Sequence, residues 1–205
     1  NNRITSENGD CVFLNLSLSS KPTDDVCLDI SIDKWDEGTL DGAGIDGVGV
    51  GFSPERWSHK QRMAVCGEDD DEADGSQTYH IVIAPLMSAD PNYSGLKPEP
   101  IELVNQDNDT AGVTISSQTV ETDENGKSSE LTFKLNTKPT SDVILTLTVS
   151  DETEAKPSVK TLTISPAQWN VGVKASIIGV ADNMIDGDQE YTVSVSFDSA
   201  DPNYK

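Results

Sequence analysis

The feature of this sequence that most limits its fold is an internal repeat. Five short motifs occur twice in the same order: Glu-Asn-Gly (7–9 and 124–126), Lys-Pro-Thr (21–23 and 138–140), Ser-Pro-x-x-Trp (53–57 and 165–169), Asp-Gly-x-Gln-x-Tyr (74–79 and 186–191) and Asp-Pro-Asn-Tyr (90–93 and 201–204). Such self-similarity is typical of repeated structural units. The spacing between copies is 117 residues for the first two motifs and 112 for the next two, so the first repeat holds five additional residues between them, which we place in the glycine-rich stretch between Ile32 and Phe52.

Within each repeat, apolar and polar residues alternate. The alternating positions are Leu14, Leu16 and Leu18, then Val26, Leu28 and Ile30, and in the second repeat Leu131, Phe133 and Leu135, then Val143, Leu145 and Leu147. A period of two is typical of half-buried β-strands, and the turn signals recur at about the 8 to 12 residues expected of a β-sandwich. The sequence therefore predicts an all-β chain of two tandem antiparallel β-sandwiches, covering residues 1–109 and 110–205.

The two repeats differ at their ends. A strand-like run, Val113–Val120, precedes Glu124, whereas only six residues precede Glu7, so we expect a truncated first strand in repeat one. Repeat one continues into a strand-like run at 101–104 that repeat two does not match, so we expect repeat two to lack its last strand. Because an unpaired strand edge invites pairing, two explanations stay open: the chain is a segment of a longer array, or a neighbouring chain supplies a strand.

The charge excludes several kinds of partner. With 36 acidic and 14 basic residues, the chain has a formal net charge of -22. That sign opposes nucleic acids and anionic membranes, and no apolar run of about 18 residues suggests a membrane span. We therefore expect no nucleic-acid partner and no membrane insertion.

The acidic residues are concentrated in repeat one. Residues 1–109 have 22 acidic and 7 basic side chains, a net charge of -15, against 14 and 7, or -7, for residues 110–205. Two clusters, at 68–74 and 107–109, each follow a predicted strand. Closely spaced carboxylates repel one another unless a cation neutralises them, and an all-oxygen ligand set in loops suits calcium. The alternative interpretation is a solvated acidic surface.

The repeated motifs, together with Lys-Pro-Thr-x-Asp-Val at 21–26 and 138–143 and Gly-Val-Ala-Asp-Asn-x-x-Asp-Gly-Asp-Gln-x-Tyr at 179–191, resemble the Calx-beta family. This family comprises the calcium-binding, immunoglobulin-like β-sandwiches of sodium-calcium exchangers and integrin β4, and the Calx-beta-like repeats of large extracellular adhesion proteins. The resemblance covers nearly the whole chain, twice. It implies a calcium site at one pole of each repeat.

The resemblance also nominates ligands. In repeat one they are Glu7, Asp33, Asp70, Asp71, Asp74, Asp107 and Asp109, with Asn108 as a further oxygen donor. The insertion shifts the alignment around Asp33, so Asp36 and Glu37 stay open as alternatives. In repeat two the matching residues are Glu124, Asp151, Asp182, Asn183 and Asp186, with Asp188 as a further candidate. Because repeat two has no terminal acidic segment, we expect repeat one to bind calcium more tightly.

All three cysteines belong to repeat one. In the fold that the resemblance implies, Cys11 and Cys66 face outward from neighbouring strands, which makes them a candidate disulfide and leaves Cys27 as a free thiol. Asn15 and Asn92 begin Asn-x-Ser triplets and are candidate glycosylation sites in a secreted protein.

Other kinds of site have less support. His59 and His80 are not accompanied by a recognisable nucleophile motif, so we expect no enzyme. Trp57 and Trp169 occupy equivalent positions, as core or turn anchors would. Trp35 has no counterpart in repeat two and is the better candidate for a ligand contact.

These observations predict an extracellular or cell-surface calcium-binding module with a structural or adhesive role. The acidic residues at 107–109 lie where repeat one leads into repeat two, so calcium would order that linker. Alternatives are a calcium-sensing regulatory module and a carbohydrate-binding sandwich. Expected partners are neighbouring repeats of a longer array, or another chain that supplies a strand.

Overall fold

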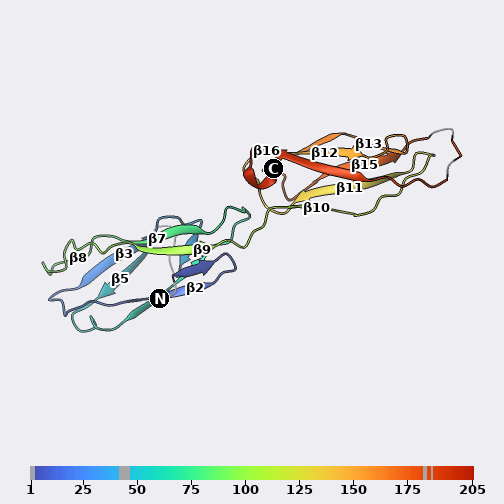
Figure 1. Cartoon of the computed structure of the whole chain (residues 1–205). Helices are drawn as coiled ribbons and strands as arrows, with labels where there is room; N and C mark the ends of the chain where they lie inside the picture. The colour runs from blue at the N-terminus through green and yellow to red at the C-terminus, as the bar shows by residue number, and fades with distance from the viewer. Residues whose placement is uncertain (1–2, 42–46, 182–183, 186) are drawn as a thin grey trace. The chain divides into compact units, whose positions relative to one another are not determined.

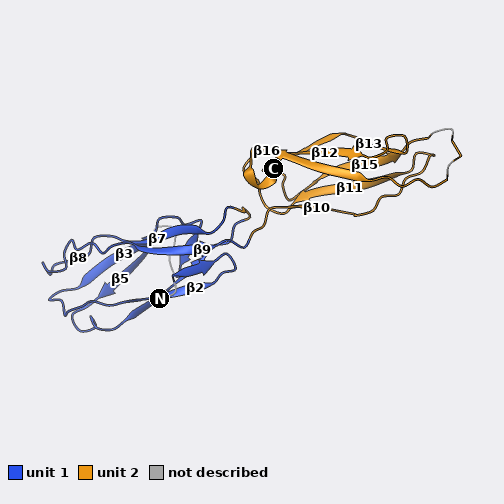
Figure 2. Ribbon diagram, viewed as in Figure 1, with its two compact units in different colours: residues 1–70, 74–108 blue, residues 71–73, 109–205 orange. Residues whose placement is uncertain are grey.

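The computed structural model describes residues 3–41, 47–181, 184–185 and 187–205 (Figure 1). These residues form β-strands and one short 3-10 helix, Pro202–Tyr204, and no α-helix occurs among them. Two compact units can be distinguished: unit 1 comprises residues 1–70 and 74–108, and unit 2 comprises residues 71–73 and 109–205 (Figure 2). The predicted pair of domains with a boundary after Asp109 stays a prediction.

Unit 1 contains two sheets. The larger has the order β1-β9-β7-β3-β5, with β8 pairing β3, and its strands are β1 (Ile4–Ser6), β9 (Ile101–Gln106), β7 (Gln77–Ile83), β3 (Val26–Ile32), β5 (Val48–Phe52) and β8 (Met87–Ser88). The smaller has the order β2-β6-β4, with β2 (Cys11–Leu16), β6 (Gln61–Gly67) and β4 (Gly38–Leu40). Strands β1 and β9 are parallel, whereas the other pairs of this unit are antiparallel.

Unit 2 also contains two sheets, and its strand pairs are antiparallel. One has the order β10-β11-β15-β13, with β10 (Val113–Ile115), β11 (Ser128–Leu135), β15 (Val173–Gly179) and β13 (Ala155–Pro157). The other has the order β14-β12-β16, with β14 (Thr161–Ile164), β12 (Val143–Val149) and β16 (Val193–Ser199). The chain is therefore all-β, with several sheets that are consistent with a β-sandwich.

The alternation of apolar residues accounts for the two cores. Val26, Leu28 and Ile30 of β3 are buried in one cluster, and the alternate apolar residues of β11 and β12 are buried in another. Leu14, Leu16 and Leu18 are only partly buried and pack at the margin of the first core. Burial of each such side chain contributes about 1.5 to 3 kcal/mol, which explains why strands with a period of two form these faces.

The repeat also locates the additional residues of repeat one more narrowly. Strands β4 and β13 are 117 residues apart, whereas the ends of β5 and β14 are 112 apart. The insertion therefore lies between β4 and β5, where residues 41–47 of repeat one correspond to residues 158–159 of repeat two. Residues 42–46 lie outside the described part of the chain.

The strand predicted at Val113–Val120 is too long, because β10 ends at Ile115. Its ladder with β11 covers three residues, and the Ser117 side chain then forms a local turn by accepting a hydrogen bond from the Thr119 amide (3.2 Å). A serine that satisfies a nearby backbone amide competes with strand pairing.

A disulfide joins Cys11 of β2 to Cys66 of β6. The two residues are directly opposite in the antiparallel ladder, and their Cα atoms are 4.0 Å apart. Cys27 is an exposed free thiol. The nominated pair is thus the one that the structure contains.

Candidate metal centre

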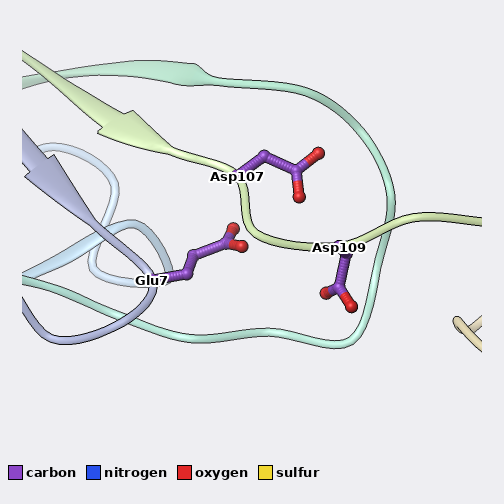
Figure 3. A group of neighbouring side chains, drawn as sticks. All are labelled: Glu7, Asp107 and Asp109. Atoms are coloured by element: carbon purple, nitrogen blue, oxygen red, sulfur yellow. The ribbon is translucent and has the colours of Figure 1, made fainter.

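Three carboxylates converge where β1 and β9 end. Glu7 follows β1, Asp107 follows β9, and Asp109 is two residues further along; one oxygen of each lies within 4.8 Å of the others (Figure 3). The parallel pairing of β1 and β9 brings their carboxyl ends to the same edge of the sheet. The Glu7 amide continues that ladder by donating to the carbonyl oxygen of Gln106 (3.0 Å).

Hydrogen bonds fix this arrangement. Glu7 is only 5% exposed, and its Oε2 accepts a hydrogen bond from the Asn108 amide (2.8 Å). Asp107 Oδ2 accepts one from the Gly75 amide (2.6 Å), and Asn108 Nδ2 donates to Asp69 Oδ1 (2.9 Å). The acidic loop after β6 is therefore held against the segment that follows β9.

The electrostatics of the group favour a cation. Two carboxylates about 5 Å apart repel by roughly 3 kcal/mol at an effective dielectric constant near 20. Glu7 is buried and Asp107 and Asp109 are half-buried, and the Oδ2 atom of Asp109 is shielded from solvent. Water therefore screens these charges less than it screens charges on an open surface. An all-oxygen set of this kind fits a hard divalent ion such as calcium.

Glu37, an alternative to Asp33 in the sequence analysis, lies beside the acidic loop. It is 6% exposed, and its Oε2 accepts a hydrogen bond from Asn105 Nδ2 (3.4 Å), which also donates to the Glu68 carbonyl oxygen (2.9 Å). Burial raises the pKa of Glu37; the Asn105 hydrogen bond opposes this, and the negative charges of Asp74 and Asp36 add to it. Glu37 thus adds a buried carboxyl group to this end of unit 1.

Asp33 has a different environment. Its Oδ1 accepts a hydrogen bond from the His80 amide (2.6 Å), and its Oδ2 lies 2.8 Å from His80 Nδ1. Burial acts to raise the pKa of Asp33, but the hydrogen bonds from His80 and the charge of its ring lower it overall. Asp33 therefore interacts with His80. Of the two carboxyl groups, Glu37 is the one that feels the charge of Asp74.

The nominated residues of the acidic loop do not all join the three-carboxylate group. Asp70 is half-buried and Asp74 is exposed. Asp71 belongs to unit 2 with Glu72 and Ala73; its carbonyl oxygen accepts a hydrogen bond from the Lys138 amide (2.7 Å). In the part of the chain that the structure describes, the only acidic, histidine or cysteine group close enough to hold one metal ion is Glu7, Asp107 and Asp109.

Among the described residues, the corresponding region of unit 2 holds no such group of three carboxylates. Glu124 is exposed, unlike Glu7, and Asp151 Oδ1 accepts hydrogen bonds from the side chain and the amide of Thr153, which lower its pKa. Asp182, Asn183 and Asp186 lie outside the described residues. Asp188 and Glu124 line an open groove with Glu154, the counterpart of Glu37.

A basic residue, Lys127, lines the same groove of unit 2 and makes its charge less negative. Lys127 occupies the position equivalent to Asp10 of unit 1, and its Nζ forms an ion pair with Glu121 (3.2 Å). A lysine at this position weakens the attraction for a cation.

Asn105 is the organising residue that the sequence analysis missed. It is 1% exposed and connects Glu37 to the loop after β6. No motif marks it, because its partners are 68 and 37 residues away in the sequence. Glu37 did carry a signal, since Glu154 repeats it 117 residues later.

Other nominated residues can also be placed. Asn15 is exposed on β2, whereas Asn92 Nδ2 donates a hydrogen bond to Asp90 Oδ1 (3.0 Å). Trp35 is 73% exposed. Trp169 packs against the core of unit 2, and Trp57 is half-buried.

Comparisons with known proteins find distant structural neighbours. No protein-family model matches this sequence, and no curated protein matches it. The similar solved structures include the calcium binding domain CBD12 of CALX1.1, with 15% identity, a TM-score of 0.36 and coverage of 88% of this chain and 74% of that chain. CBD12 from CALX1.2 has 14% identity, a TM-score of 0.35 and coverage of 94% and 76%.

A third neighbour is the CsuC-CsuE chaperone-tip adhesion subunit pre-assembly complex of Acinetobacter baumannii, with 9% identity, a TM-score of 0.35 and coverage of 95% and 93%. Likenesses at this level do not assign a family. Among the described residues, no helix has the length and apolar character needed to cross a membrane.

Proposed function

We propose that this chain is a calcium-binding β-sandwich module without enzymatic activity. The convergence of Glu7, Asp107 and Asp109 within 4.8 Å carries the proposal. Calcium takes six to eight oxygen ligands in flexible geometry, so water and backbone carbonyl oxygens would complete the site. Glu37, on the neighbouring loop, would contribute negative charge.

The proposed module consists of two immunoglobulin-like sandwiches of the Calx-beta type, at 1–109 and 110–205, in an extracellular or cell-surface protein. The internal repeat and the two sheets in each unit support this arrangement. The disulfide between Cys11 and Cys66 supports an oxidising compartment, because such bonds persist mainly outside the cytosol.

The proposed role is structural or adhesive. Asp107 and Asp109 lie in the short segment between the end of β9 at Gln106 and the start of β10 at Val113. A calcium ion bound by both would restrict the backbone of this segment and stiffen the connection between neighbouring repeats. Small-angle scattering with calcium and with EDTA tests this part: identical profiles would contradict a role for calcium in the linker.

Two other functions make different demands. A calcium sensor requires an affinity of about 10⁻⁷ to 10⁻⁵ M, whereas extracellular modules bind at about 10⁻⁴ to 10⁻³ M. A carbohydrate-binding sandwich requires an exposed aromatic platform, and Trp35 is the exposed tryptophan. Loss of glycan-array signal in Trp35→Ala would favour that function.

Calorimetric titration of the EDTA-treated, dialysed protein with calcium tests the proposal. We expect saturable binding that becomes at least about tenfold weaker in Glu7→Gln, because the variant removes a buried anionic ligand. Glu99→Gln, which changes an exposed glutamate in the loop before β9, is the matched control and should bind like the wild type. An unchanged affinity in Glu7→Gln, or no calcium binding at all, would overturn the proposal.

A further inference from the structure

Unit 1 has a separate cavity beside the turn that joins β5 to β6. This β5–β6 cavity has a volume of about 560 Å³, and its lining comes from β3, from β5 and from residues 53–61. The volume is in the range of small-molecule sites. Strand β6 begins here at Gln61 and ends at Gly67, before the acidic loop, so seven strand residues, or about 20 Å, separate the cavity from that loop.

Two small residues leave room for the cavity. Cys27 of β3 lies opposite Gly51 of β5 in the antiparallel ladder, and both are exposed. The equivalent pair in unit 2 is Ile144 opposite Thr163. Gly51 has no side chain, and a Cβ atom added there would lie 4.0 Å from Cys27 Sγ. Unit 1 is therefore open at a place where unit 2 has two branched side chains.

The turn over the cavity has the same backbone in both repeats. The Arg56 amide donates a hydrogen bond to the Ser53 carbonyl oxygen (3.0 Å), and the His59 amide donates one to the Arg56 carbonyl oxygen (3.0 Å). The equivalent bonds in residues 165–171 measure 2.9 and 3.1 Å. The scaffold of the turn therefore does not depend on the side chains that differ between the repeats.

Those side chains are basic in unit 1 and uncharged in unit 2. The cavity is lined by Arg56, His59 and Lys60, and the residues at the same positions of repeat two are Gln168, Val171 and Gly172. Among the described residues, no carboxylate forms an ion pair with any of the three basic side chains. Three basic groups thus meet at one cavity of a repeat whose net charge is -15.

The rest of the lining can accept hydrogen bonds. It includes the carboxylate of Asp25 and the side chain of Gln61. Gln61 Nε2 donates to the Gly51 carbonyl oxygen (2.5 Å), so the Gln61 amide oxygen is the group that can accept a hydrogen bond from a ligand. Basic donors next to these acceptors suit a ligand that has both an anionic group and hydroxyl groups.

We propose that the β5–β6 cavity binds an acidic monosaccharide unit of the uronic acid class. Arg56 and Lys60 would bind its carboxylate, because a guanidinium fork matches a carboxylate in a bidentate geometry. Asp25 and Gln61 would accept hydrogen bonds from its hydroxyl groups. The acidic surface elsewhere opposes a long polyanion, whereas a single unit meets mainly the local basic charge, since charges more than about 10 Å away are screened. The site goes beyond the proposed calcium binding and uses none of its ligands.

Titration of the isotope-labelled full chain with sodium glucuronate, followed by NMR, tests the site. We expect saturable shifts of the amides in residues 53–61, with binding at least about tenfold weaker in Arg56→Gln. Gln168 occupies this position in repeat two, where the same turn forms, so the variant should fold. Lys97→Gln removes an exposed positive charge that does not belong to the lining; it is the matched control and should bind like the wild type.

Other ligands separate the contribution of the charge from that of the sugar ring. Glucose has the ring and hydroxyl groups without the carboxylate, and acetate has the carboxylate alone. Each should bind at least about tenfold more weakly than glucuronate. Methyl glucuronide distinguishes the source of the ligand: binding equal to that of the free acid indicates a unit at the end of a glycan, and weaker binding indicates the free sugar.

Cys27 provides a readout in the wild-type protein. It is the free thiol of the chain and lines the cavity, so saturating glucuronate should slow its alkylation by iodoacetamide several-fold, whereas glucose should not. Both effects should persist in calcium-free buffer and in Glu7→Gln, which separates this site from the calcium centre. The proposal would be overturned by the absence of saturable binding, by equal binding of glucose or acetate, or by an unchanged affinity in Arg56→Gln.

Discussion

Two tyrosines show how one residue type behaves differently in the two repeats. Tyr79 is completely buried, and its hydroxyl group forms a hydrogen bond with Thr5, whereas Tyr191 makes the equivalent bond with Thr122 at a half-buried position. Burial raises the pKa of Tyr79; the bond to Thr5 opposes this, and the negative charge of Glu37 adds to it. The strand that carries Tyr79, β7, is paired along both edges, whereas β16, which begins two residues after Tyr191, pairs with β12 alone among the described strands.

The substitution Tyr79→Phe should lower the free energy of unfolding by about 1 to 2 kcal/mol, because it removes a buried hydrogen bond. Tyr191→Phe should cost less than half as much, because water can replace the lost bond. Urea titrations of both variants provide the measurement. Equal losses would contradict the difference in burial on which the prediction depends.

Asp201 should link stability to pH. Burial acts to raise its pKa, but hydrogen bonds from the amides of Thr140 (2.7 Å) and Asn203 (2.9 Å) lower it below the usual 3.8. As the pH falls past 3.8, the unfolded chain takes up a proton before the folded chain does. The stabilisation is therefore complete above that pH and is lost as the pH falls through the lower, folded-state pKa.

Melting temperatures measured from neutral pH down to about pH 2.5 test this linkage. Asp201→Asn should lower the melting temperature at neutral pH and flatten its decline in acid. Asp198→Asn, on the exposed face of β16, is the control and should keep the acid dependence of the wild type. If both variants decline equally, Asp201 does not contribute.

At the scale of strands, the sequence predicted the features that follow from the alternation of apolar and polar residues. It missed the features that depend on residues far away in the sequence. Alternation correctly identified the buried faces of β3, β11 and β12, because side chains in a strand point to opposite faces in turn. It overextended β10, since a strand also needs a partner along its whole length. The buried Glu37 accepts a hydrogen bond from Asn105, 68 residues away, and no local pattern reveals that contact.

The disulfide between β2 and β6 should contribute strongly to the stability of unit 1. It spans 55 residues of sequence, and closing a loop of that length stabilises the folded state by up to about 4 kcal/mol in the chain-entropy treatment. The double variant Cys11→Ser/Cys66→Ser should therefore unfold at a much lower urea concentration. Cys27→Ser, which removes only the free thiol, is the control and should unfold like the wild type.

For the whole molecule, the formal charge of -22 should make stability depend on salt. Repulsion between like charges opposes the compact state, and dissolved ions screen it over about 10 Å at 0.1 M ionic strength. In EDTA, added sodium chloride should raise the melting temperature. With saturating calcium the rise should be smaller, because part of the repulsion is already neutralised; equal rises in both conditions would contradict a neutralising ion.

The parallel pairing of β1 with β9 has a mechanical consequence. A pulling force on the chain would enter unit 1 at Ile4 and leave at Gln106, at opposite ends of these two strands. Such a load would shear the rungs that join Ile4, Thr5 and Ser6 to Val104, Asn105 and Gln106 together, instead of peeling them apart singly. An ion held by Glu7 and Asp107 would link the carboxyl ends of β1 and β9. Tension along the chain would then meet its greatest resistance where the carboxylates converge.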